Sequence, residues 1–177
     1  LDSSTWGSVS GEAIAEQVFS PNWDLTEHYD TPTYAWTGQQ VIDALNASPH
    51  FVNSLSHASP TYDSRLRNAD VAALTNTSPY LMYSQGCDSG AFDVDMSIAE
   101  QHVLSPHGAF AVVMNSRLGW YPSGSTAAFS HFFAREFWDA IFHEGKVLLG
   151  EANHDARMDT LGIVGSTCLY RLVYFET

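Results

Sequence analysis

The sequence is poor in cysteine, with only Cys87 and Cys168 among 177 residues. Small secreted domains that rely on disulfides carry several cysteines, so a disulfide framework is excluded as the basis of this fold. Cys168 lies in an apolar segment near the end of the chain, where a cysteine usually serves as a small buried hydrophobe. A structural bridge between the two would abolish thiol chemistry, but a chain with so few cysteines argues against such a bridge. Cys87 is therefore the candidate for thiol chemistry.

Basic residues are also scarce, because 7 Lys and Arg face 20 Asp and Glu, for a formal net charge of −13. This charge excludes nucleic acids and anionic membrane surfaces as expected partners and favours cationic substrates. No apolar run approaches the roughly 20 residues of a membrane span, and no signal segment opens the chain. With 45% hydrophobic residues, the chain has enough apolar side chains for one sizeable core.

Two short apolar runs end in residues that carry chemistry. Residues 80–84 run into Gln85-Gly86-Cys87-Asp88-Ser89-Gly90, and residues 51–56 run into His57-Ala58-Ser59-Pro60. Both runs are bounded by turn formers and are short for helices, so they are interpreted as buried strands. A thiol becomes a useful nucleophile at neutral pH when an imidazole lies nearby, so His57 and Cys87 form a candidate base and nucleophile.

Residues 68–74 between these strands have helical spacing, with Asn68 expected as the N-cap. A right-handed β-α-β unit would bring His57 and Cys87 to the carboxyl edge of neighbouring parallel strands. Alternation of helices and strands continues along the chain and predicts an α/β domain. The further expected elements are helices at 11–19, 39–45 (capped by Thr37), 97–103 and 129–143, strands at 24–29 and 109–114, and a mostly helical segment 147–177 with a break at Gly162 and Gly165.

The order of a His and then a Cys, each closing an apolar strand, resembles the caspase-like cysteine peptidases of clan CD. The stretches 85–93 (QGCDSGAFD) and 108–117 (GAFAVVMNSR) are most similar to the gingipain-type group. The resemblance implies a three-layer α-β-α fold with a mainly parallel sheet, in one domain over residues 1–177. It also implies a central strand before the first helix, and none is visible. The chain is therefore expected to be a fragment of a longer one, with a strand that comes from elsewhere as the alternative.

The same resemblance implies roles for individual residues. Cys87 would attack the peptide carbonyl, His57 would transfer protons, and the backbone N–H groups of Ala58 and Cys87 would hold the oxyanion. Substrate contacts are expected from Gln85, Ser116, Trp120 and Tyr121. The implied partner is a protein or peptide substrate, the implied location is extracellular or at the cell surface, and no metal or organic cofactor is implied.

The sequence departs from the resembled pattern at two positions. Ala58 replaces the glycine that often follows the histidine, although alanine keeps the backbone N–H. Gln85 stands where some relatives carry the aspartate that binds a basic side chain. A preference for Arg or Lys would therefore need another acid, for which Asp30 and Asp88 are the candidates nearest in sequence.

Other interpretations of these residues stay open. A lone His or Cys after an apolar run is usually structural, and a non-catalytic binding or adhesion module, or another thiol hydrolase or transpeptidase, could keep this fold. His143, Glu144 and His154 fit no zinc spacing, and Asp93 with Asp95 favours a surface turn over a calcium loop. Arg117 is equally compatible with a structural ion pair and with a substrate contact.

Overall fold

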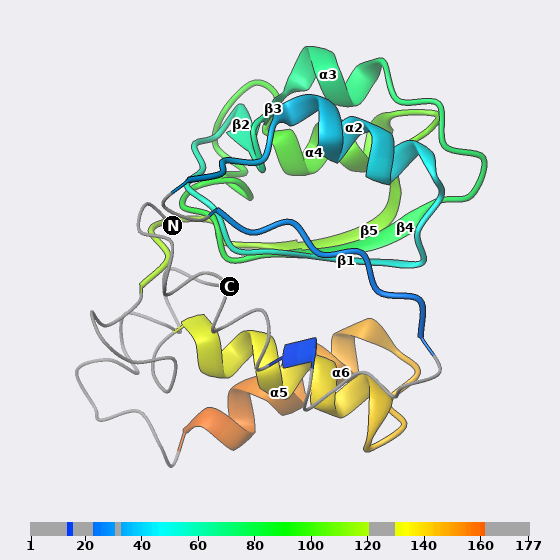
Figure 1. The fold of residues 1–177 in the computed structure, drawn as a ribbon. Helices are drawn as coiled ribbons and strands as arrows, with labels where there is room; N and C mark the ends of the chain where they lie inside the picture. Colours follow the sequence, from blue (N-terminus) through cyan, green and yellow to red (C-terminus); the bar gives the residue numbers. More distant parts are fainter. Residues whose placement is uncertain (1–13, 16–22, 31–32, 121–129, 162–177) are drawn as a thin grey trace.

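The computed structural model describes residues 14–15, 23–30, 33–120 and 130–161. Three parallel strands form a sheet in the order β1-β4-β5, and a short antiparallel pair, β2-β3, lies apart from it. Helices α2, α3 and α4 lie on one face of the sheet, and α5 and α6 lie on the other (Figure 1). The elements are α2 (Gly38–Asn46), β1 (Phe51–Ser54), β2 (Tyr62–Asp63), β3 (Leu66–Arg67), α3 (Asn68–Ala72), β4 (Tyr80–Ser84), α4 (Ile98–Leu104), β5 (Ala109–Met114), α5 (Ser130–Phe142) and α6 (Leu149–Thr160).

This arrangement confirms the predicted α/β class, with a parallel sheet between helical layers, and agrees with a caspase-like fold. The central strand β4 is buried along its whole length. Its side chains alternate between two cores. Leu81 and Tyr83 pack against Phe137 and Trp138 of α5, whereas Tyr80 and Met82 belong to the core beneath α2, α3 and α4. Within the described residues, no helix is long and apolar enough to cross a bilayer.

Side-chain caps explain where two of the helices begin. The hydroxyl of Thr37 accepts from the backbone N–H of Gln40, and the Gln40 side chain accepts from the backbone N–H of Thr37, which completes a capping box for α2. Ser97 and Glu100 repeat this arrangement for α4. Hydrogen bonds from the backbone and the hydroxyl of Ser97 lower the pKa of Glu100.

The cap of α3 differs from the prediction. Asn68 is the first helical residue rather than the N-cap, and Arg67 takes the cap position in an extended conformation. The Asp70 carboxylate accepts a hydrogen bond from the Arg67 backbone N–H at 2.8 Å, so an acid inside the first turn replaces the expected side-chain cap. The β2-β3 hairpin between β1 and α3 was not predicted either.

The remaining predicted elements agree in part with the structure. Residues 24–29 are extended but pair with no strand among the described residues. Ile14 and Ala15 are helical, and the rest of the predicted helix 11–19 lies outside the described residues. The predicted segment 147–177 contains α6, while its residues 162–177, including Cys168, also lie outside them.

Candidate active site

The ends of β1 and β4 bring His57 and Cys87 to the same edge of the sheet. The two strands run parallel, and Ser54 is paired with Ser84 at their carboxyl ends. His57 and Cys87 each lie three residues beyond that pair. The side chain of His57 is exposed, and Cys87 is a partly buried free thiol. The two side chains that were expected to meet therefore leave the sheet at matching positions.

A close contact joins the two loops that carry these residues. Gly86 lies so near Ala58 that a methyl group on Gly86 would stand 2.4 Å from the Cβ of Ala58. These are the residues directly before Cys87 and directly after His57. Glycine at position 86 therefore allows the Cys87 loop to pack against the His57 loop.

The Cys87 loop is held by backbone hydrogen bonds to the segment after β5. The N–H of Asp88 donates to the carbonyl of Arg117 at 2.8 Å, and the N–H of Gly90 donates to the carbonyl of Asn115 at 2.9 Å. Asp88 has a φ of 57°, a left-handed conformation that Asp tolerates better than most residues. The sulfur of Cys87 lies 3.9 Å from the Gly119 carbonyl. The loop therefore turns sharply immediately after the thiol.

The candidate substrate residues differ in their exposure. Gln85 is only 5% exposed, and among the described residues neither its amide oxygen nor its amide nitrogen has a hydrogen-bond partner. Ser116 is also 5% exposed, whereas Trp120 is 36% exposed. The backbone N–H of Trp120 donates to the hydroxyl of Ser130 at the start of α5. Tyr121 lies outside the described residues.

The His57 loop is held by a buried carboxyl that the sequence did not single out. Asp63, at the end of β2, is 1% exposed and accepts hydrogen bonds from the hydroxyls of Ser56 at 2.9 Å and Ser64 at 3.2 Å. Ser56 also accepts from the backbone N–H of Ser64. The same oxygen of Asp63 would lie 3.2 Å from a methyl group on Gly86. Asp63 therefore touches residues next to both His57 and Cys87.

Burial and hydrogen bonding shift the pKa of this carboxyl in opposite directions. Loss of water raises the pKa of Asp63 above its ordinary value, and hydrogen bonds from Ser84, Ser56 and Ser64 oppose that rise. Its second oxygen has no hydrogen-bond partner within the part of the chain that the structure describes. Nothing in the sequence marks Asp63 as buried, because it ends the two-residue strand β2 in a polar segment, and acidic residues in such segments are mostly exposed.

The two candidate acids for a basic substrate side chain are in different environments. Asp30 is already bound to Arg65 at 2.6 Å, and the Arg65 guanidinium lies over the ring of Trp36 at 4.2 Å. The carboxylate of Asp88 is half-buried beside the thiol and has no ion-pair partner among the described residues. Of the two, Asp88 is therefore the acid still available to a ligand.

Two further charged groups that were singled out in the sequence, Arg117 and His143, are bound to neighbours. Arg117 forms an ion pair with Asp93 at 3.0 Å, and His143 bonds to Asp139 at 2.6 Å. On α6 and the preceding loop, the carboxylates of Glu144, Asp155 and Asp159 lie within 4.8 Å of one another. Lys146 lies 3.2 Å from Asp155 and balances part of their charge.

Comparison with known proteins places the chain in a family. The sequence profile of peptidase family C25 matches residues 4–175, which is nearly the whole chain. The chain belongs to peptidase family C25. The members of this family, the gingipain family of clan CD, are cysteine peptidases, so the resemblance seen in the sequence is confirmed.

A solved structure described as "Structure of Protease" shares the fold of this C25 chain, with a TM-score of 0.63 and 19% sequence identity. The match covers 94% of the present chain and 42% of that chain. The C25 chain thus spans less than half the length of this structural relative. No curated protein sequence matches the present chain.

Proposed function

We propose that this chain is a cysteine endopeptidase in which Cys87 is the nucleophile and His57 is the general base. The observation that supports this assignment best is the contact between Gly86 and Ala58, at 2.4 Å for an added methyl group. It joins the two loops next to the thiol and the imidazole. Family membership supplies the reaction class, and the loop contact supports the choice of Cys87 and His57.

The proposed reaction proceeds in two steps. His57 takes the proton of the Cys87 thiol, and the thiolate attacks the carbonyl carbon of the peptide bond. The C–N bond then breaks as His57 returns the proton to the leaving amine, which leaves a thioester on Cys87. Water, deprotonated by His57, hydrolyses the thioester and restores the thiol.

The oxyanion of each tetrahedral intermediate would be held by the backbone N–H groups of Ala58 and Cys87. Neither N–H donates to another described residue, so both are available to a ligand. Removing one donor of this kind in other hydrolases costs about 10²–10³ in rate. The departure of Ala58 from glycine does not affect this role, since the donor belongs to the backbone.

We also propose a preference for Arg or Lys before the cleaved bond. The chain carries 20 acidic and 7 basic residues, and the carboxylate of Asp88 lies directly after the nucleophile. A carboxylate next to a substrate cation, shielded from water, gives a strong charge-assisted hydrogen bond. Asp30 is a weaker candidate because Arg65 already occupies it.

The test is peptide cleavage combined with thiol labelling. Cys87→Ala should abolish both cleavage and labelling by a thiol-reactive peptide probe, and His57→Ala should slow cleavage by about 10²–10⁴-fold. Cys168→Ala is the matched control and should change neither. Circular dichroism of each variant verifies folding. Undiminished cleavage by Cys87→Ala would contradict the assignment, and a folded wild-type chain that binds peptides without cutting them would support a binding module instead.

The preference for Arg or Lys is tested separately. A peptide library varied at the residue before the cleaved bond should be cut fastest at Arg and Lys, and Asp88→Asn should reduce that preference. A preference for Asp, Asn or an apolar residue would contradict the basic preference and leave the roles of Cys87 and His57 unaffected.

A further inference from the structure

The turn of the β2-β3 hairpin has a backbone that its residue types disfavour. Ser64 and Arg65, its two central residues, have φ values of 51° and 62°. Both values lie in the left-handed region, which residues with a Cβ atom rarely adopt. Two consecutive residues of this kind persist only where surrounding contacts fix them. The turn is therefore held by its contacts rather than by local preference.

Arg65 attaches the turn to the segment before α2. Its guanidinium donates to the carboxylate of Asp30 at 2.6 Å and lies over the ring of Trp36, 4.2 Å from the ring centroid. The same carboxylate accepts a hydrogen bond from the backbone N–H of Trp36 at 3.1 Å. We call these mutual contacts of Asp30, Trp36 and Arg65 the Arg65 clamp. The two charged side chains are only 30% and 25% exposed, so water screens their attraction less than it does on an open surface.

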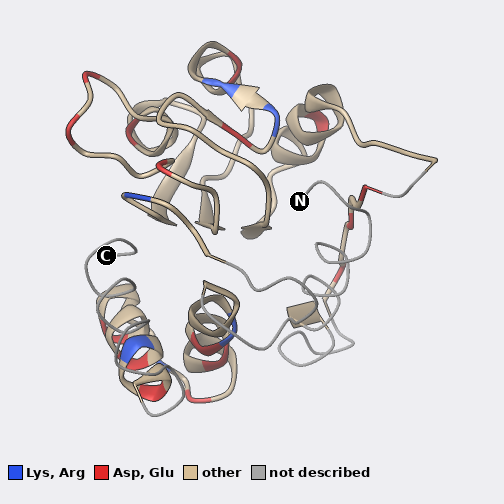
Figure 2. Cartoon of the chain, turned by 90° about the vertical axis from the view of Figure 1, so that its left-hand side faces the viewer, with Lys and Arg blue, Asp and Glu red and all other residues tan. Residues whose placement is uncertain are grey.

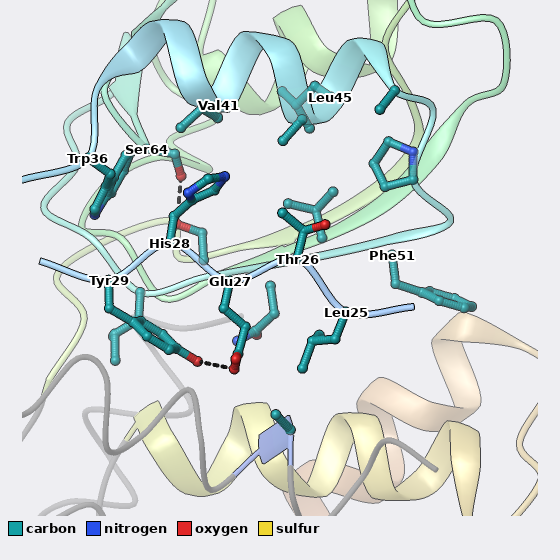
Figure 3. A pocket seen from close by; sticks show the side chains of 18 of the residues that line it. Leu25, Thr26, Glu27, His28, Tyr29, Trp36, Val41, Leu45, Phe51 and Ser64 are labelled. Atoms are coloured by element: carbon teal, nitrogen blue, oxygen red, sulfur yellow. Dashed lines mark hydrogen bonds between the residues drawn. The ribbon is translucent and has the colours of Figure 1, made fainter. Parts of the chain in front are cut away.

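The first residue of α2 packs directly on the turn. A methyl group on Gly38 would stand 2.7 Å from the carbonyl oxygen of Arg65, so glycine at this position allows the close approach. Figure 3 shows Trp36 and Ser64 at this end of α2. Ser64 is only 6% exposed, and its hydroxyl lies 2.6 Å from that of Ser54 at the end of β1 (Figure 3). The turn therefore contacts both α2 and the sheet.

The same turn also binds the His57 loop. The backbone N–H of Ser64 donates to the hydroxyl oxygen of Ser56 at 3.1 Å, and Ser56 directly precedes His57. The hydroxyls of Ser56 and Ser64 both donate to Asp63. Since Ser64 and Arg65 are neighbours in the chain, a shift of Arg65 would move Ser64 and the hydrogen bonds that hold Ser56.

We propose that Arg65 is a positioning residue for His57. The clamp fixes the turn, and the turn fixes the residue before the histidine, so loss of the guanidinium should displace the imidazole relative to the thiol. In this role Arg65 neither transfers a proton nor contacts the substrate. The inference rests on the proposed function, in which His57 is the general base of Cys87.

The first test is the kinetics of Arg65→Ala. Alanine has a Cβ atom and so keeps the backbone restriction of arginine, but it removes the clamp. A displacement of about 1 Å between catalytic groups costs on the order of 10²-fold in rate, so a partial displacement should lower kcat about tenfold. KM should change little, because the groups that bind the substrate stay in place. Arg65→Lys keeps the charge without the planar fork of donors, so its kcat should lie between the two.

Arg67→Ala is the matched control, because Arg67 lies in the same hairpin. Its guanidinium lies over the ring of Tyr62 at 5.6 Å but forms no ion pair with any described residue. The backbone N–H of Arg67, which binds Asp70, is kept in this variant. Its kcat should therefore stay close to wild type. Denaturant unfolding of both variants verifies that each is folded under the assay conditions.

Thiol labelling at two pH values separates positioning from a general loss of structure. At about pH 7 the reaction of Cys87 with a small alkylating reagent depends on the nearby imidazole, so Arg65→Ala should slow this reaction. At about pH 9.5 a thiol ionises without a base, so there the variant and the wild type should react at similar rates. A fold that is loosened as a whole would change both rates.

A double variant tests whether the effect passes through the hairpin. Arg65→Ala and Asp63→Ala both act on the His57 loop, so their combined loss of kcat should be smaller than the product of the two separate losses. If Arg65→Ala does not fold, Trp36→Leu removes the stacked ring but keeps the pair of Arg65 with Asp30, and it should lower kcat several-fold.

Three results would overturn the proposal while the wild-type chain still cleaves peptides through Cys87. They are an unchanged kcat in Arg65→Ala, an equal loss of kcat in Arg67→Ala, and labelling that falls alike at both pH values. Undiminished cleavage by Cys87→Ala is a different outcome, because it would contradict the proposed function itself and the inference with it.

Discussion

The two loops that meet at the candidate active site are held by different means. The Cys87 loop is fixed through backbone groups, which donate to the carbonyls of Asn115 and Arg117. The His57 loop has backbone hydrogen bonds farther from the histidine, between Ser59 and Tyr62 and from Ile98 to Pro60. Next to His57 it is fixed through a side chain, because the hydroxyl of Ser56 is bonded to the buried carboxyl of Asp63. A backbone hydrogen bond survives most substitutions, whereas a side-chain network depends on each of its members. The position of the histidine should therefore be more sensitive to mutation than that of the cysteine.

The charge distribution adds to this contrast. Figure 2 shows acidic residues spread over both helical layers, with few basic residues among them. The site itself holds one buried acid, Asp63, and one partly exposed acid, Asp88. Three predictions test the difference between the two loops, beginning with the point where they touch.

The largest effect is expected for Gly86→Ala. Its new methyl group would lie 2.4 Å from the Cβ of Ala58, and neither group can rotate away. Overpacking of this kind costs about 1–3 kcal/mol of folding free energy. Separation of the two loops by even about 1 Å should slow peptide cleavage on the order of 10²-fold. Denaturant unfolding and kcat measure the two effects.

The matched variant for this prediction is Ala58→Gly, which removes the opposing methyl group but keeps the backbone N–H. Combined with Gly86→Ala, it should restore most of the lost stability and activity, so the two changes should be strongly non-additive. Additive losses would show that Gly86 matters for some reason other than contact between the loops.

A smaller effect is expected for Asp63→Ala, which leaves the hydroxyls of Ser56 and Ser64 without their acceptor. Loss of a buried hydrogen-bond partner costs about 1–3 kcal/mol. The His57 loop should loosen, so kcat should fall, while labelling of Cys87 by a small alkylating reagent at about pH 9.5, where a thiol ionises without a base, should change little. An equal fall in labelling would mean that Asp63 supports both loops alike.

Asp63→Asn is the matched control, since it keeps the shape and an acceptor oxygen. Burial raises the pKa of Asp63, so the folded chain binds this proton more tightly than the unfolded chain does. The free energy of unfolding should therefore fall as pH rises from about 4 through the raised pKa. Asp63→Asn should remove that fall in urea unfolding series, and its kcat should exceed that of Asp63→Ala.

The smallest effect is expected for Arg117→Ala. This change removes the ion pair between Arg117 and Asp93, in which the two side chains are 35% and 55% exposed. It keeps the Arg117 carbonyl, which accepts a hydrogen bond from the backbone N–H of Asp88. Exposed ion pairs contribute about 0–1 kcal/mol, so stability and kcat should both stay close to wild type. A loss of cleavage with intact folding would instead assign Arg117 a substrate contact.

Much of the fold could be predicted because the relevant signals are local. Strands β1, β4 and β5 are short apolar runs bounded by turn formers, and Thr37 marks the start of α2 through its own hydrogen bond. The β2-β3 hairpin was missed because Ser64 and Arg65, at its turn, have φ values of 51° and 62° without being glycine. Sequence patterns predict such turns mainly from Gly, Asn or Asp.

The site could be predicted only in part, because only some of its residues have a local signal in the sequence. Cys87 and His57 were found because each follows an apolar strand, and parallel pairing fixes where strand ends meet. Asp63 was not found because its burial depends on contacts between Ser56, Ser64 and Gly86, which are brought together only by the folded hairpin. The occupation of Asp30 by Arg65 is likewise a tertiary contact with no local signal.

The complete burial of β4 has a consequence for how the chain reaches this fold. Tyr80–Ser84 carries no charge, and it pairs with β1 and β5 across separations of about 30 residues, as in the pairs of Leu81 with Phe51 and with Ala111. Contacts this distant form late, whereas the adjacent helices α5 and α6 can associate early. Until β1 and β5 have paired with it, β4 is an exposed, aggregation-prone segment that can pair with another unfolded chain. The rate at which β1 and β5 cover it therefore governs the yield of folded protein, and Pro79, directly before the strand, restricts pairing beyond its start.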